Sequence, residues 1–295
     1  MAPSTALPVA GDHTDTRVQY YHREVLAVLP YQGGEFLLDF EPILPGEGEV
    51  TAALRLFARL SKSYPRAFNV VISDALYTNA TWFNKIKQSG VEVQSVFKQE
   101  KRDLMRDFRA VCALQTPQEQ QHDGRQYQLW DSAGFLTWPQ MEYPVRLVRS
   151  IERWTVTRQG VGKDKTLPPE QRLESLTSEW IWATTLPVAL AKTMVVVLLG
   201  HRRWIIENEG FNELKNRWRI GHVYAHHPTA ILNFLLVAIL VFNLFHLFVQ
   251  RNLNRVWRKK NLKYILEKVR AGFYNGEWCV SLVIPPVHHL PVTVT

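Results

Sequence analysis

The chain is 295 residues long and 46% hydrophobic, enough to bury a substantial core, which argues against general disorder. Lysine and arginine number 35 against 27 acidic residues, and the formal net charge of +8 favours a polyanionic partner, nucleic acid before anionic lipid. Two widely separated cysteines without metal-ligand spacing argue against a disulfide framework and indicate a reducing intracellular compartment.

The first third of the chain has the pattern of an α/β sheet. Strands are predicted over 17–29 and 35–43, joined by a Gly-Gly turn as an antiparallel pair, and a helix over 50–60 follows the PGEGE break. The apolar run in FNVVISDALY indicates a strand covered on both faces, a helix is predicted over 79–88, and VEVQSVF supplies another strand. This order predicts a mixed sheet with helices packed on it.

The rest of the chain changes character twice. Residues 110–160 mix Gly, Pro and Gln with strand-like runs such as YPVRLVRS and RWTVTRQ, the pattern of a β-rich insertion, and GKDKTLPPEQ is a polar loop. Helical character returns over 186–200 and 203–218, and a basic helix is expected over about 253–272. The Pro-rich end is expected to be poorly ordered.

An apolar stretch from Thr229 to Val249 is long enough to span a bilayer, and basic residues follow it. Asn233, Asn243 and His246 lie within the stretch, and each is costly in lipid without a partner. A helix that is apolar all round is also typical of the centre of a large domain. We therefore favour a buried helix over a membrane span.

Two acidic residues are candidates for chemistry. Asp74 follows an apolar run, at the strand end that faces the ligand-binding crevice of open α/β sheets; the alternative is an N-cap of the next helix. Glu207 lies four residues after Arg203 on one helix face, and the alternative there is a surface ion pair. Position in the sequence alone leaves both alternatives open.

The phrases VVISDALY, RWIIENEGFNELK and HHPTAILNFLL…FNLFHLFVQRNL, in this order, resemble the DDE transposases of insertion sequences, in the group with a Tyr–Arg–Glu–Lys signature. The resemblance spans roughly residues 17–254. It implies an RNase H-like core in which three acidic residues hold two magnesium or manganese ions, with Asp74 as the second acid and Glu207 as the third. It also implies DNA as the partner, at the ends of the element and at the target, and allows a homodimer on DNA.

The chemistry that the resemblance implies accounts for these residue types. Cutting and rejoining a phosphodiester needs in-line attack by an oxygen nucleophile, and two ions about 3.5–4 Å apart activate the nucleophile and stabilise the leaving oxygen. Magnesium prefers hard carboxylate oxygens, so Asp and Glu suit it better than His or Cys. Arg203 matches the signature arginine and is expected to grip a phosphate.

The sequence departs from the family pattern at three places. Gly200 stands where the signature tyrosine is expected, and Leu214 where the lysine is expected, with Lys215 one residue late, about 100° further round a helix. No residue matches the first aspartate, whose strand would precede Arg17. We therefore expect an N-terminally truncated transposase with little or no turnover.

Further DNA contacts are predicted around the sheet. Lys98 and Arg102 follow the strand after Asp74 and are expected to line the DNA path, unless they form only a solvated turn. In relatives, an aromatic residue of the β-rich insertion stacks on an extruded base. Trp130 or Trp138 would suit that role, although a buried core tryptophan is the more common case.

The predicted fold is α/β, an RNase H-like mixed sheet flanked by helices, with a β-rich insertion and a helical C-terminal part. The predicted parts are a tail over 1–16, a partial core over 17–109, the insertion over 110–180, the helical part over 181–272 and a tail over 273–295. The predicted function is DNA transposition by metal-dependent cleavage and strand transfer, in the cytoplasm at the bacterial nucleoid and away from membranes. The alternatives are a catalytically dead DNA-binding remnant and a single-span membrane protein.

Overall fold

The computed structural model describes residues 23–31, 34–98, 102–135, 137–159, 171–204, 206, 212–218, 220–222 and 227–275. Two compact units contain them. The larger unit is built mainly from Phe40–Glu207, and the smaller unit from Leu26–Asp39 together with Asn208–Thr295.

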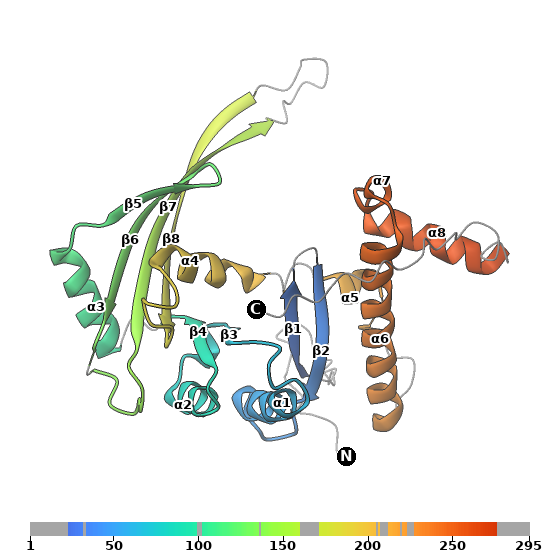
Figure 1. The fold of residues 1–295 in the computed structure, drawn as a ribbon, viewed down its shortest axis with the longest axis horizontal. Helices are drawn as coiled ribbons and strands as arrows, with labels where there is room; N and C mark the ends of the chain where they lie inside the picture. Colours follow the sequence, from blue (N-terminus) through green and yellow to red (C-terminus); the bar gives the residue numbers. More distant parts are fainter. Residues whose placement is uncertain are drawn as a thin grey trace, which may run out of the picture. The chain divides into compact units, whose positions relative to one another are not determined.

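A six-stranded sheet organises the larger unit, in the order β3-β4-β8-β7-β6-β5 (Figure 1). The strands are β3 (Val70–Ser73), β4 (Glu92–Val96), β5 (Gln118–His122), β6 (Arg125–Ala133), β7 (Arg146–Gln159) and β8 (Gln171–Thr184). β3 and β4 are parallel, and each of the other neighbouring pairs is antiparallel. The sheet is therefore mixed.

Helices cover both faces of this sheet. They are α1 (Glu49–Ser63), α2 (Ala80–Gln88), α3 (Asp103–Leu114) and α4 (Thr193–Arg202). The first three pack on one face, where Phe83 and Phe108 are fully buried against Leu147. α4 packs on the other face through Val196 and Val197. A mixed sheet flanked by helices confirms the predicted fold class and is consistent with the RNase H-like fold.

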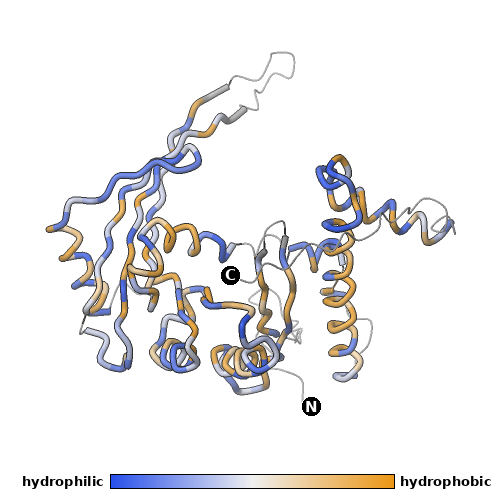
Figure 2. Tube along the Cα trace, in the orientation of Figure 1, coloured by the Kyte–Doolittle hydropathy of each residue, from blue (hydrophilic) through white to orange (hydrophobic). Residues whose placement is uncertain are grey.

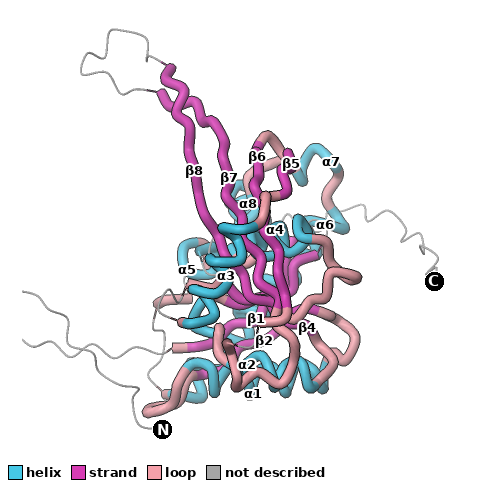
Figure 3. Tube along the Cα trace, turned by 90° about the vertical axis from the view of Figure 1, so that its left-hand side faces the viewer, coloured by secondary structure: helices cyan, strands magenta, loops and turns pink. Residues whose placement is uncertain are grey.

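The predicted β-rich insertion continues the same sheet. β7 and β8 are each 14 residues long and pair along their whole length, forming the long ribbon of Figure 3. The base of β8 pairs with β4, so that Trp182 lies opposite Val96. The strands β5 to β8 therefore belong to the same sheet as β3, the strand that Asp74 follows, and β4 joins them to it. The boundaries predicted between the parts of the chain remain predictions.

The smaller unit is dominated by one long helix. Its elements are α5 (Asn212–Asn216), α6 (Pro228–Asn252), α7 (Arg255–Arg258) and α8 (Leu262–Asn275). β1 (Glu24–Tyr31) and β2 (Gly34–Pro42) form a two-stranded sheet, most of which belongs to this unit. α8 packs on the last turns of α6, where Ile265 and Leu266 are buried with Phe245 and Val249.

α6 is apolar along most of its length (Figure 2) and is long and apolar enough to cross a membrane, a test that core helices of soluble proteins also pass. The prediction of a buried helix holds for one face, which includes Leu235 and Phe242. The other face carries exposed apolar side chains, among them Val237 and Leu240. The prediction was a helix buried on all sides. Among the described residues, α6 is buried on one side only.

Three helical segments differ from the prediction. α3 lies where the sequence was interpreted as the start of the β-rich region; its apolar residues Leu104, Phe108 and Cys112 follow helical spacing and are buried. α4 begins at Thr193, not at 186, because the residues from Pro187 onward form a turn first. The basic helix is split into α7 and α8.

Asparagine caps explain that split. The Asn254 side chain accepts hydrogen bonds from the backbone N–H groups of Val256 and Trp257, and Asn261 accepts one from Lys263. Each asparagine therefore starts a new helix. Residues 17–22, residues 162–170 of the GKDKTLPPEQ loop and the Pro-rich end lie outside the described residues, and Gln171, the last residue of that loop, begins β8.

Candidate functional site

Asp74 directly follows β3, as predicted. Its Oδ1 accepts a hydrogen bond from the backbone N–H of Leu76 at 2.9 Å and so caps the short 3-10 turn Ala75–Tyr77. The side chain is half-buried. The N-cap alternative is therefore correct, but the observed cap engages one oxygen of the carboxylate, and it does not prevent the group from serving as a metal ligand.

Hydrogen bonds between β3, β4 and the following turn fix the position of Asp74. Ser73 and Ser95 share a buried hydroxyl–hydroxyl hydrogen bond of 2.6 Å across the two parallel strands. The Thr78 hydroxyl donates to the carbonyl of Val96 at 2.8 Å. The chain on both sides of Asp74 is thus anchored to β4, at the carboxyl end of the parallel pair, where open α/β sheets bind ligands.

The start of α4 is anchored by a buried arginine. Arg146 on β7 donates from Nε and Nη2 to the two carboxylate oxygens of Asp131 at 2.8 and 2.5 Å. Its Nη1 donates to the carbonyls of Leu186 and Ala191, at the turn that leads into α4. The Thr193 hydroxyl donates to the same aspartate at 2.6 Å. This network sets where α4 begins on the sheet.

The end of α4 is anchored by a contact between a buried glutamate and His201. Glu152, fully buried on β7, contacts His201 Nε2 at 2.5 Å and accepts hydrogen bonds from Ser150 and Arg125. Burial raises the pKa of the Glu152 carboxyl, but its contacts with His201, Ser150 and Arg125 outweigh burial and lower the pKa below the ordinary value. The carboxylate therefore stays ionised and holds the last turn of α4.

Arg203, the predicted signature arginine, is the C-cap of this anchored helix, and its backbone N–H donates to the carbonyl of Gly200 at 3.3 Å. Glu207, the predicted third acid, lies outside the described residues. Lys215 is exposed on α5, in the smaller unit. Arg203 thus lies two residues beyond His201, which Glu152 holds in place. The structure fixes the helix that precedes the predicted glutamate.

The structure gives a physical reason for a glycine at position 200, where the resemblance predicts a tyrosine. The backbone of Gly200 packs directly on the indole of Trp182, so that a Cβ at this position would overlap the ring. Trp182 is 1% exposed and stacks on Trp180, with ring centroids 6.1 Å apart. An aromatic side chain from β8 therefore fills the space beside α4, and the helix can approach only because it has no side chain there.

The other predicted DNA contacts lie against aromatic rings. The Arg102 guanidinium stacks over Trp138 at 4.9 Å, and burial lowers the Arg102 pKa. Trp138 is 8% exposed and packs on Phe83. The Lys98 ammonium lies 5.9 Å over Trp180. Trp138 thus has the contacts of a core tryptophan, as the alternative held.

Sequence reasoning missed a more accessible aromatic group. Trp204, two residues beyond the end of α4, is 45% exposed, and its ring meets that of Trp180 edge-on with centroids 5.6 Å apart. Together with Lys98, these rings form a cation–aromatic surface on the larger unit. The sequence signal that could have predicted this surface is the W-x-W spacing of Trp180 and Trp182 in β8, together with Lys98 after β4.

Comparison with known proteins agrees with these features. The model of the transposase DDE domain family matches residues 46–244, about two thirds of the chain. No curated protein matches the sequence. The matched range contains the strand that precedes Asp74, the β-rich segment, α4 and the position of Glu207. The chain belongs to the transposase DDE domain family.

Proposed function

We propose that this chain carries the part of a transposase that cuts and rejoins DNA by metal-dependent phosphoryl transfer, with Asp74 and Glu207 as two of its metal-binding carboxylates. Family membership links the chain to DNA transposition and makes DNA its substrate class. The observation that carries the proposal is the position of Asp74, half-buried at the carboxyl end of β3 and held there by β4.

The Asp74 carboxylate fits the hard divalent ions that the family resemblance implies. It is an oxygen donor, half-exposed, and its observed hydrogen bond leaves coordination sites on both oxygens. Two magnesium or manganese ions, when bound, would supply charge neutralisation on the phosphate. The role of this chain would be to hold Asp74 on the sheet and Glu207 beyond the anchored end of α4.

DNA contacts are proposed for the cationic residues around this part of the sheet. Arg203 would grip a phosphate from the end of α4, and Lys98 and Arg102 would contact the backbone beside their aromatic partners. Lys215 is the proposed counterpart of the signature lysine. A role for Trp138 in DNA binding would be indirect, through the orientation of Arg102, because the ring is buried.

The proposed activity of these 295 residues alone is low. No residue of the sequence stands where the resemblance puts the first acid, and losing one of three carboxylates weakens a two-ion site. A catalytically silent protein that still binds DNA is the second proposal, supported by the net charge of +8. A homodimer on DNA and a place in the bacterial cytoplasm are parts of the same proposal.

The test is a DNA-nicking and DNA-binding assay with the purified chain and its D74N/E207Q variant, in Mg²⁺ or Mn²⁺. We expect salt-sensitive binding of supercoiled DNA by both proteins, with an affinity that falls as ionic strength rises, because phosphate contacts release counterions. We expect little or no nicking by either. The Lys98→Ala, Arg203→Ala double variant should bind more weakly and with a shallower salt dependence.

Each other outcome has a defined meaning. Nicking by the wild type that disappears in D74N/E207Q would support the site but contradict the low activity. Nicking of equal strength in both proteins would contradict the assignment of Asp74 and Glu207. DNA binding that does not respond to salt would contradict the phosphate contacts.

A further inference from the structure

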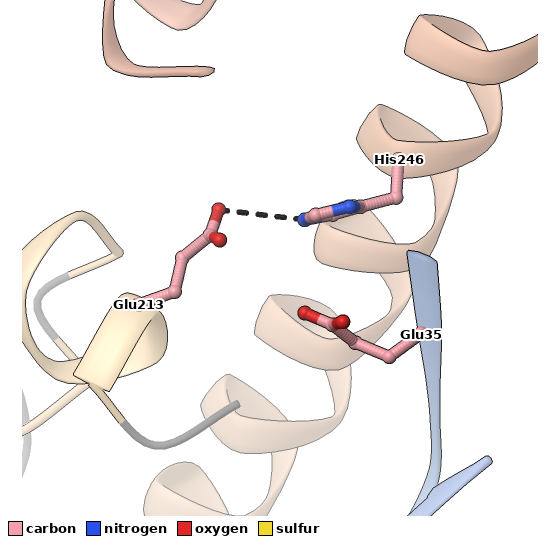
Figure 4. A group of neighbouring side chains, drawn as sticks. All are labelled: Glu35, Glu213 and His246. Carbon is pink, nitrogen blue, oxygen red and sulfur yellow. Dashed lines mark hydrogen bonds and ion pairs between the residues drawn. The ribbon is translucent and has the colours of Figure 1, made fainter. Parts of the chain in front are cut away.

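Three buried side chains with metal-ligating atoms meet inside the smaller unit (Figure 4). Glu35 comes from β2, Glu213 from α5 and His246 from α6. One ligand atom from each lies within 4.8 Å of the other two. Their residues are only 2%, 8% and 6% exposed, respectively. Carboxylates and imidazoles are rarely buried this deeply without a role, because desolvation is costly.

The spacing of the imidazole and one carboxylate resembles that of two ligands of one ion. His246 Nε2 lies 3.4 Å from Glu213 Oε1. A hydrogen bond between a charged donor and a carboxylate is normally about 2.7–2.9 Å long. Two ligands bound to Zn²⁺ at about 2.1 Å in tetrahedral geometry are separated by about 3.4 Å. The contact is therefore long for a hydrogen bond and matches the spacing around a metal.

The other contacts of Glu213 are long as well. Arg217 Nη1 lies 3.3 Å from its Oε2, and Trp218 Nε1 lies 3.5 Å from its Oε1. At these distances neither contact is a short, charge-assisted hydrogen bond.

The imidazole is held in place by its neighbours. The His246 ring stacks on Phe242 with centroids 4.2 Å apart and meets Phe245 edge-on at 5.8 Å. One turn earlier, the Asn243 amide makes two hydrogen bonds with the backbone of Leu37, at 2.9 and 2.8 Å. These two hydrogen bonds hold β2 against α6. They therefore also fix the position of Glu35 relative to His246. Such preorganisation is what a metal site requires.

We propose that Glu35, Glu213 and His246 bind a divalent transition-metal ion, Zn²⁺ in the first place, that joins β2, α5 and α6. One imidazole nitrogen with two carboxylates suits Zn²⁺ better than Mg²⁺, which prefers oxygen donors alone. With three protein ligands, water would complete a four-coordinate ion. The site is separate from the proposed catalytic acids, since it uses neither Asp74 nor Glu207. Its role is to stabilise the smaller unit.

The test is calorimetric titration of the purified full chain with Zn²⁺ alone, after treatment with a chelator and desalting. We expect one ion per chain and a higher melting temperature with zinc. Glu213→Gln and His246→Gln should each weaken binding by at least about tenfold, since even indirect partners of a metal contribute that much. Glu267→Gln is the matched control, because it removes an exposed carboxylate of the same unit that pairs only loosely with Lys263.

Cobalt provides a second measurement that does not depend on the stability of a variant. Wild-type protein loaded with Co²⁺ should show the visible absorption bands of a four-coordinate ion, and these should be displaced by Zn²⁺. D74N/E207Q should keep both the zinc stoichiometry and the spectrum, which separates this site from the proposed catalytic one. No zinc binding by the wild type, or binding unchanged in both ligand variants, would overturn the proposal.

Discussion

Replacing Arg146 with methionine is expected to destabilise the larger unit by about 3–5 kcal/mol, the range measured when one partner of a buried ion pair is removed. Arg146 is 3% exposed and makes all its observed hydrogen bonds to Asp131 and to the carbonyls of Leu186 and Ala191. Methionine fills much of the same space but leaves the half-buried Asp131 carboxylate and two buried carbonyls without their arginine donor. Urea unfolding followed by tryptophan fluorescence measures the effect.

Two further variants make this prediction specific. Arg106→Met removes an exposed arginine whose partner Asp103 is also exposed, and it should change the free energy of unfolding by less than about 0.5 kcal/mol. Adding Asp131→Asn to Arg146→Met should recover part of the loss, because the unpaired charge is removed. A loss below about 1 kcal/mol in Arg146→Met would mean that water reaches the carboxylate and that α4 is not anchored this way.

Placing alanine at Gly200 is expected to cost about 1–3 kcal/mol, the usual effect of overfilling a packed core. The new Cβ would overlap the Trp182 indole, whose Cδ1 would be 2.8 Å away. The ring is buried between the sheet and α4 and stacks on Trp180, so it has little room to move. Gly200→Tyr, which introduces the residue that the resemblance predicts, should cost more than the alanine.

A double-mutant cycle tests this explanation for the missing tyrosine. If the Trp182 indole occupies the space, Trp182→Ala combined with Gly200→Tyr should be more stable than the sum of the two single effects predicts. Gly272→Ala is the control, because a Cβ there meets nothing within 4 Å and alanine favours the helix. Equal, small effects of alanine at both glycines would contradict the close approach of α4 to Trp182.

The larger unit was predictable where local patterns coincide with packing. The strand before Asp74 was visible because Val70 to Ile72 form a short apolar run, and β3 is parallel to a fully buried β4. The helix after it was visible because Asn79 caps its start and Gly90 follows its end with a φ of 80°. These are short-range signals, which a single sequence displays directly.

The features that were missed depend on contacts between distant residues. Arg146 makes hydrogen bonds to residues up to 45 positions away, and nothing around Arg146 in the sequence distinguishes it from an exposed strand arginine. That the Trp182 indole fills the space beside Gly200 could not be predicted without knowing that β8 lies under α4. The sequence showed only that position 200 is a glycine where the resemblance predicts a tyrosine; it did not show that Trp182 fills the space there.

The candidate metal cluster shows the same limit. His246 and Asn243 were noticed as polar residues in an apolar helix, which indicated partners for them but not their identity. The partners are residues of β2 more than 200 positions earlier, and Glu213 of α5. α3 was missed for a different reason, because the polar strand that follows it dominated the interpretation of the region.

The measurement that tests the central claim most directly is Mn²⁺ binding to the DNA-bound chain, followed by electron paramagnetic resonance. The protein would carry Glu213→Gln and His246→Gln, so that the second proposed site does not contribute. We predict that this protein binds Mn²⁺ weakly and that adding D74N/E207Q abolishes the binding. Adding Asp103→Asn instead, which changes an exposed carboxylate, should leave the binding unchanged. Mn²⁺ binding that is unaffected by D74N/E207Q would contradict the assignment of these two carboxylates as ligands of the catalytic metal.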